Sequence, residues 1–275
     1  MITILHNLTA EECALRVGAY YRAWGDSVER MASGKKIRNA ADDPAGLVSH
    51  ARMATSVRAL GQAQRNAQDA ISMLQTGEGA LQVVDQVLVR MKELAAQAAS
   101  DSYSPDQRRV MDAEFRQLAS EVDRIARSTT FNGIDLLSDG VTSLPILVGD
   151  QETGGTKTLT IDTVDATAGG LGIDLLTLQT ADGARSAMGT LGTAMVTKDG
   201  YQTMFGYKIR HLENAASILM IQREELGSAA SRIADADVAK EAARLMRNQV
   251  LAQAQSAIMH RANDMAYIAV ALLNL

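Results

Sequence analysis

Few residues in this sequence are of types that could do chemistry, and they are scattered along the chain. Asp42 and Asp43 form an adjacent carboxylate pair that could serve in acid–base or metal chemistry. However, Asp43 directly precedes Pro44 and a long apolar pattern, which is how a helix N-cap is arranged, and Asp42 would favour the positive start of that helix. We therefore expect both carboxylates to be structural.

The remaining candidate ligands and nucleophiles lack the spacing of a site. Cys13 is the only cysteine, so it can form neither an internal disulfide nor a multi-thiolate metal site. Asp235 and Asp237 lie beside Arg232 in an expected helical run, which favours salt bridges over metal binding. No zinc-peptidase motif, P-loop or nucleophile elbow includes the four histidines or the glycines. The histidines are His6, His50, His211 and His260. We expect no enzyme activity, metal or cofactor.

Composition excludes further classes. The chain has 47% hydrophobic but only 4% aromatic residues, which favours helices packed through small side chains. The 27 basic and 32 acidic residues are interspersed, so we expect no nucleic-acid partner. The longest apolar run, Met265 to Leu273, is too short for a membrane span, and the first residues lack the features of a cleavable secretory signal. Any export would need another route.

Apolar residues recur with heptad spacing at both ends of the chain, which predicts helices that pack along a seam. These residues are the candidate assembly seam. Its N-terminal members are Val17, Tyr21, Trp24, Val28 and Met31, and its C-terminal members are Leu251, Ile258, Met265, Ile268, Leu272 and Leu275.

Between the ends, the same pattern predicts one uninterrupted helix over 60–98 and a shorter helix that starts at the Ser104-Pro105 capping signal and folds back antiparallel. Gly61, Gly77 and Gly79 lie inside the long helix, where close helix approach would explain them. Residues 139–184 are rich in Gly, Thr and Asp, and a short apolar run before Gly154-Gly155, with alternating apolar and polar residues after it, predicts a β-hairpin. The predicted fold is mainly α, a long antiparallel helical bundle or coiled coil formed by both termini with a small β-hairpin insert.

Several motifs resemble those of bacterial flagellins. An ungapped likeness to the flagellin signature S-x-E-R-L-S-S-G-x-R-I-N-S-A-x-D-D-A-A-G covers 27–46, which read SVERMASGKKIRNAADDPAG. The C-terminal motif around S-R-I-x-D-A-D is similar to 230–237, ASRIADAD, and Q-I-L-x-Q-A to 249–254, QVLAQA. Arg90, Leu94 and Glu114 match the family patch that a Toll-like receptor recognises, so they form a candidate innate-receptor patch.

The resemblance implies a structural subunit of the extracellular flagellar filament, made by coupled folding and helical polymerisation. It assigns 1–43 and 233–275 to an inner coiled-coil layer, 44–140 and 184–232 to outer-core helices, and 141–183 to a short β-rich insert without large outer domains. The implied partners are further copies of the chain, an export chaperone, and filament cap and junction proteins. The alternatives are a hook–filament junction protein and a soluble coiled-coil adaptor or exported effector.

Overall fold

The computed structural model describes residues 7–138, 142–149 and 158–273, with the backbone alone for 266, 267 and 269–273. The predicted mainly helical fold is confirmed. The helices are α1 (Leu8–Ser33), α2 (Pro44–Ala98), α3 (Pro105–Ser128), α4 (Ala181–Ala234) and α5 (Val238–Leu273). The strands are β1 (Thr130–Phe131), β2 (Ile134–Asp135), β3 (Ser143–Leu147) and β4 (Thr158–Asp162).

Two predicted helix starts are confirmed by their capping hydrogen bonds. The Asp43 carboxylate accepts the amide of Gly46 at 2.9 Å, at the start of α2. At the start of α3, the Ser104 hydroxyl accepts the Gln107 amide and the Gln107 side chain accepts the Ser104 amide, which completes a capping box. Both helices thus begin where their local sequence satisfies the first free amides.

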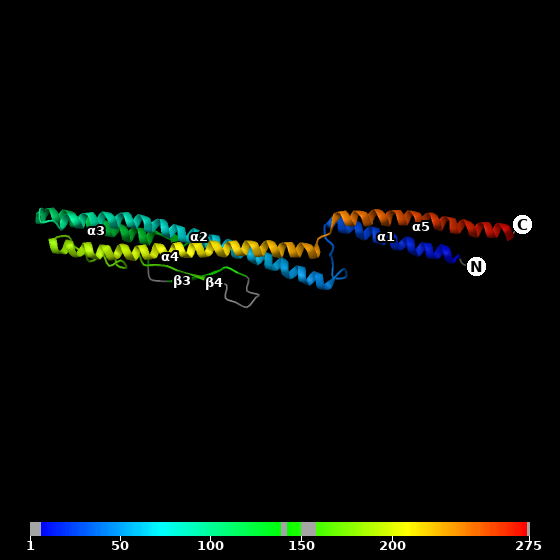
Figure 1. Ribbon diagram of the computed structural model, residues 1–275, viewed down its shortest axis with the longest axis horizontal. Coiled ribbons are helices and arrows are strands. Elements are labelled where there is room, and N and C mark those ends of the chain that lie inside the picture. The colour runs from blue at the N-terminus through cyan, green and yellow to red at the C-terminus, as the bar shows by residue number, and fades with distance from the viewer. Residues whose placement is uncertain (1–6, 139–141, 150–157, 274–275) are drawn as a thin grey trace. The chain divides into compact units, whose positions relative to one another are not determined.

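The chain divides into two compact units. The terminal unit comprises residues 1–55 and 225–275, and the central unit comprises 56–224. In the central unit α2, α3 and α4 lie side by side (Figure 1). Asp85 of α2 forms an ion pair with Lys198 of α4, and Gln64 of α2 accepts a hydrogen bond from Arg223 of α4. The earlier residue of α2 contacts the later residue of α4, so the two helices are antiparallel.

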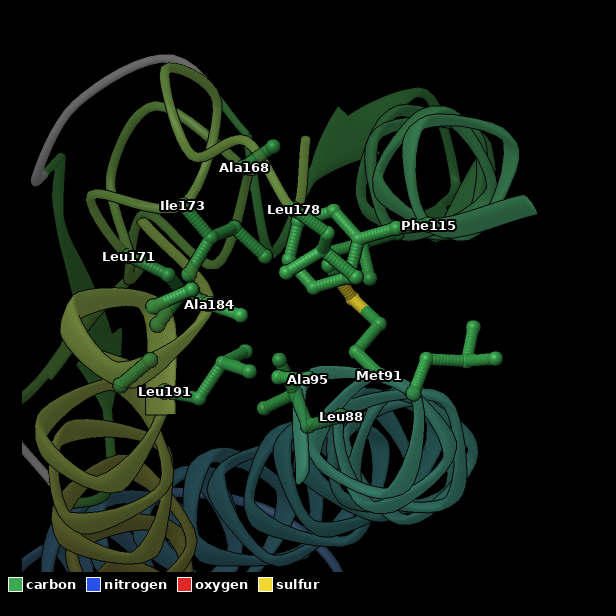
Figure 2. Close-up of a cluster of buried hydrophobic side chains, with 14 of the residues drawn as sticks. Leu88, Met91, Ala95, Phe115, Ala168, Leu171, Ile173, Leu178, Ala184 and Leu191 are labelled. Atoms are coloured by element: carbon green, nitrogen blue, oxygen red, sulfur yellow. The ribbon is translucent and has the colours of Figure 1, made fainter. Parts of the chain in front are cut away.

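The central unit has a continuous apolar interior. Around one end, Leu88, Met91 and Ala95 of α2 point toward Phe115 of α3 and Leu191 of α4 (Figure 2). Leu171, Ile173 and Leu178, from the segment before α4, close this cluster. A second cluster joins the middle of α2, including Ala70, Met73 and Leu81, to Phe205 and Leu212 of α4 and Ile161 of β4. The predicted fold-back of the third helical segment is confirmed, since Arg90 of α2 donates to Glu114 of α3 at 2.8 Å and Val84 of α2 shares a buried cluster with Val122 of α3.

The predicted hairpin is present in the insert. β3 pairs antiparallel with β4, with Ser143 opposite Asp162 and Leu147 opposite Thr158. The Gly154-Gly155 turn assigned to it lies outside the described residues. A second, two-residue pair between β1 and β2 was not predicted, although its Asn132-Gly133 turn, with φ of 50° and 77°, is a standard hairpin signal.

Two local expectations are wrong. Asp235 and Asp237 do not lie in one helical run, because α4 ends at Ala234 and Asp237 caps α5 by accepting the Lys240 amide at 3.1 Å. Close approach explains Gly77, where an added Cβ would lie 2.7 Å from Phe205, but not Gly79, where a Cβ would meet nothing within 4 Å.

Candidate functional site

The residues first considered for chemistry do not converge. Among the described residues, no group of three or more His, Cys, Asp or Glu could hold a metal ion. No helix of the described chain is both long and apolar enough to cross a bilayer. His6 lies outside the described residues, whereas His211 stacks near Tyr207 on α4 with ring centroids 6.1 Å apart. In the part of the chain that the structure describes, the candidate site is therefore a surface and not a reactive cluster.

One helix pair makes the main contact of the terminal unit, which also contains the start of α2 and the end of α4. α1 and α5 run antiparallel and side by side (Figure 1). Near one end the Asn7 side chain donates to the carbonyl of Ala262 at 2.9 Å, and farther along Gln255 donates to the Cys13 sulfur at 3.2 Å. The buried residues of this pair include Cys13, Ser27 and Ala252, so small and polar side chains make much of the contact.

The candidate assembly seam lies largely outside this contact. Val17 and Met31 are half-buried, but Tyr21 is 56% exposed and Ile268 is 58% exposed. The other exposed members are Trp24, Val28, Leu251, Ile258 and Met265. The Leu272 side chain and all of Leu275 lie outside the described residues. The seam was predicted by spacing alone, and spacing does not distinguish a face that meets the same chain from one that meets another.

A shallow hollow separates two seam residues from α5. Tyr21 and Trp24 of α1 line about 150 Å³ of space together with Gln249, Ala252 and Gln253. The aromatic side chains therefore flank the small Ala252 without filling the space beside it. Tyr21 and Trp24 are thus not fully covered by α5 here.

Charged residues gather where α1, the segment after it and the start of α5 meet. The Arg38 amide donates to Asp42 at 3.0 Å, and this hydrogen bond holds the pKa of Asp42 below its usual value. Arg30 lies 3.8 Å from Asp42 and 4.0 Å from the buried Glu241. Asp42 thus organises the turn before α2 instead of acting as a second cap.

Backbone hydrogen bonds tie the same turn to the break between α4 and α5. The Lys36 amide donates to the Ala234 carbonyl at 2.7 Å, and the Ala236 amide donates to the Gly34 carbonyl at 2.9 Å. Gly34 has φ of 68°, a left-handed conformation that suits glycine at a helix end. The flagellin-like stretch 27–46 and the motif 230–237 therefore meet in space.

The structure brings together only two members of the candidate innate-receptor patch. Arg90 of α2 donates to Glu114 of α3 at 2.8 Å on the surface, and this carboxylate raises the pKa of Arg90. Leu94 is buried in the core cluster. Its exposure could not be read from the sequence, because a leucine at heptad spacing can face either side of a helix.

Sequence reasoning missed two buried charges of the central unit. Asp112 of α3 accepts the Leu178 amide at 2.7 Å and so fixes the segment before α4. Lys198 of α4 lies 2.7 Å from Asp85 and 2.6 Å from Asp199. Burial lowers the Lys198 pKa, but these carboxylates outweigh it and the pKa is raised. No sequence signal marked either residue, since charges on long helices are usually solvated.

Comparisons with known proteins match nearly the whole chain. The bacterial flagellin N-terminal helical region matches residues 4–142, and the bacterial flagellin C-terminal helical region matches 188–273. A flagellin from Halalkalibacterium halodurans is 33% identical over 98% of this chain and 99% of its own. Flagellin FlaB1 from Treponema pallidum is also 33% identical, with the same coverage. The crystal structure of Bacillus cereus flagellin, 30% identical, aligns with a TM-score of 0.51 over 56% of this chain and 88% of that one.

Proposed function

The chain belongs to the bacterial flagellin family and is a structural subunit of the flagellar filament, and from this we propose that its terminal helices complete their folding only when neighbouring copies cover them. The family is one of structural proteins, and its filaments are extracellular. In this proposal, folding of the terminal helices and entry into the filament are coupled.

The uncovered apolar surface of the terminal unit is the observation that supports this proposal. Two helices can shield only one stripe each, whereas an apolar seam facing away from the partner stays in water. Exposed large apolar side chains occur along both helices of this unit. They include Leu8, Leu15, Tyr21, Met246, Val250, Ile258, Met265 and Ile268. Each such side chain contributes about 1.5–3 kcal/mol when fully buried, so assembly supplies a large driving force.

Mechanistically, the seam residues are proposed to pack against equivalent helices of neighbouring copies and so form an inner coiled-coil layer from 1–43 and 233–275. A contact between two different surfaces, repeated by a screw operation, gives an open filament instead of a closed ring. Growth is then confined to the end where an incoming chain finds partners for its seam. The chain has no catalytic part in this process.

The wider set of partners follows from family membership and is proposed with it. The chain would leave the cell unfolded through the flagellar export apparatus, with a chaperone on its C-terminal helix. At the growing end it would meet cap proteins, and at the base of the filament it would meet junction proteins. A chaperone bound to α5 would cover the exposed apolar residues of that helix and prevent premature polymerisation.

Recognition by a Toll-like receptor is a separate proposal, supported by the exposed Arg90–Glu114 pair. Because the Leu94 side chain is buried, it would contribute only indirectly, by packing that holds α2 and Arg90 in position. We expect Arg90→Ala to reduce activation of receptor-expressing cells by monomeric protein, and unchanged activation would refute this role.

The substitution Ile258→Asp tests the assembly proposal. Ile258 is exposed on α5, so a carboxylate is tolerated in the monomer but would be buried without a partner in the filament. We expect no filaments by electron microscopy after seeding, with unchanged helix content by circular dichroism. Val110→Asp, at an exposed apolar position of α3, is the matched control. Normal filaments from Ile258→Asp would contradict the proposal.

A further inference from the structure

One narrow stripe of α4 in the central unit is exposed and contains no Asp, Glu, Lys or Arg. Its positions recur every three or four residues, whereas the exposed charges of the same stretch, Asp199, Arg210 and Glu213, lie beside the stripe. The stripe consists of Val196, Gly200, Thr203, Tyr207, His211, Asn214, Ile218 and Ile221. The stripe is roughly 37 Å long at 1.5 Å per residue. Its large apolar members are Val196, Tyr207, Ile218 and Ile221, which we call the α4 ridge.

Such a face is unusual for the surface of a water-soluble unit. Val196 is 70% exposed and Tyr207 is 66% exposed. By contrast, the exposed face of the neighbouring α3 carries Arg109, Arg116 and Arg124. On α3 the exposed apolar Val110 stands among these charges, whereas on α4 four large apolar residues share one stripe, which is typical of a surface that contacts protein.

A shallow apolar groove of about 370 Å³ lies elsewhere on the same unit. Ala70 and Met73 of α2 are among its lining residues, together with Phe131 of β1, Ile134 of β2 and Leu147 of β3. Ile134 and Leu147 are partly exposed, whereas Ala70 and Met73 are buried. The groove is thus an apolar hollow in which buried α2 residues are bordered by exposed strand residues.

The ridge cannot enter the groove of its own copy. Phe205 and Ile209 of α4 are buried in the cluster that also contains Ala70 and Met73. Tyr207 lies about 200° around the helix from Phe205, so the ridge points away from that cluster. The ridge and the groove are therefore two different surfaces of one unit, which is what an open polymer requires of a contact between copies.

We propose that the α4 ridge of one subunit packs into the groove of a second copy of this chain in the filament. This inference rests on the proposed function, which supplies the neighbouring copies. Charge supports the pairing: Asp69 is an acidic lining residue of the groove, and Arg210 flanks the ridge. Both side chains are exposed, so each can reach a neighbouring copy across the contact.

Two complementary substitutions test the pairing. Ile218→Glu places a negative charge on the ridge, where Ile218 is 55% exposed, and Ile134→Lys places a positive charge in the groove. Each variant alone should raise the critical concentration for polymerisation at least about tenfold, because burying an unpaired charge is unfavourable. Val110→Glu, at a position 72% exposed on α3, should leave it unchanged.

An equimolar mixture of the two variants should polymerise near the wild-type concentration. In alternating copies, the modified ridge then meets the modified groove with opposite charge, and the unmodified surfaces meet each other. No rescue by mixing, or normal polymerisation of either variant alone, would overturn the pairing. Failure of the wild-type protein to form filaments would instead refute the proposed function, so the two failures are distinguishable.

Discussion

At the scale of single residues, Gly77 and Gly79 stand two positions apart on α2 in opposite surroundings. A Cβ at Gly77 would lie 2.7 Å from the Phe205 ring, whereas a Cβ at Gly79 would meet nothing within 4 Å. Glycine in a helix interior costs about 0.5–1 kcal/mol relative to alanine. The first glycine makes room for a ring, and the second has no such role within one chain.

Replacing each glycine by alanine should therefore change stability in opposite directions. Gly79→Ala should raise the free energy of unfolding of the monomer by about 0.5–1 kcal/mol through helix propensity. Gly77→Ala should lower it, since overpacking against Phe205 costs about 1–3 kcal/mol. Urea unfolding of the two variants, followed by circular dichroism, measures both. Equal effects of the two substitutions would show that the ring does not occupy this position.

Asp112 shows how a buried charge can be structural. Its carboxylate accepts hydrogen bonds from the Leu178 amide at 2.7 Å, the Thr177 hydroxyl at 3.0 Å and the Gln179 side chain at 3.1 Å. Burial by itself raises the Asp112 pKa, but these hydrogen bonds, with Arg116, outweigh it and the pKa lies below its usual value.

The lowered pKa predicts acid sensitivity of the central unit. The ionised carboxylate stabilises the fold above the unfolded-state pKa of about 3.9, and this contribution is lost as pH falls through the folded-state value. Asp112→Asn should lower the free energy of unfolding at pH 7 by about 1–3 kcal/mol and flatten its decline in acid. Asp174→Asn, at an exposed position, is the control. Denaturant unfolding at several pH values measures the free energy of unfolding of both variants. If this free energy declines in acid as steeply in Asp112→Asn as in the wild type, the proposed role of Asp112 is excluded.

At the scale of elements, local signals set where helices begin. The capping box at Ser104 could be read from Ser-Pro-Asp-Gln alone, because all of its hydrogen bonds are made within four residues. Ser104→Ala should lower the free energy of unfolding by about 0.5–2 kcal/mol. The nearby loop substitution Ser102→Ala should have a smaller effect. Thermal unfolding of both variants compares them, and equal shifts would mean that the cap is not used.

The elements that sequence reasoning missed depend on contacts far along the chain. The break between α4 and α5 is stabilised by hydrogen bonds to Gly34 and Lys36, about 200 residues earlier in the chain. Because these partners are distant in sequence, the apolar pattern around the break did not indicate it. Likewise, the periodicity that predicted α2 placed Leu94 on a helix but did not show whether its side chain faces the core or the solvent. Spacing predicted the elements and the family motifs, but which apolar face meets the same chain and which meets another required the fold.

At the scale of the whole molecule, the two units differ in what they bury. The central unit has large side chains with almost no exposure, such as Phe115, Leu88 and Leu191. In the terminal unit the buried residues of the helix pair are small or polar, and large apolar residues remain exposed. Since burial of apolar surface is the main favourable term in folding, the two units should differ in stability before assembly.

Hydrogen exchange of the full-length protein measures that difference directly. In the monomer, amides of α1 and of the second half of α5 should exchange at least about tenfold faster than amides of α2 between Leu81 and Ala98, because local opening exposes little buried apolar surface. In the filament, neighbouring copies should remove the difference by covering the seam. The α2 amides serve as the internal reference in both samples. Strong protection of α1 in the monomer would mean that the terminal helices are already stable alone, and coupled folding and assembly would have to be abandoned.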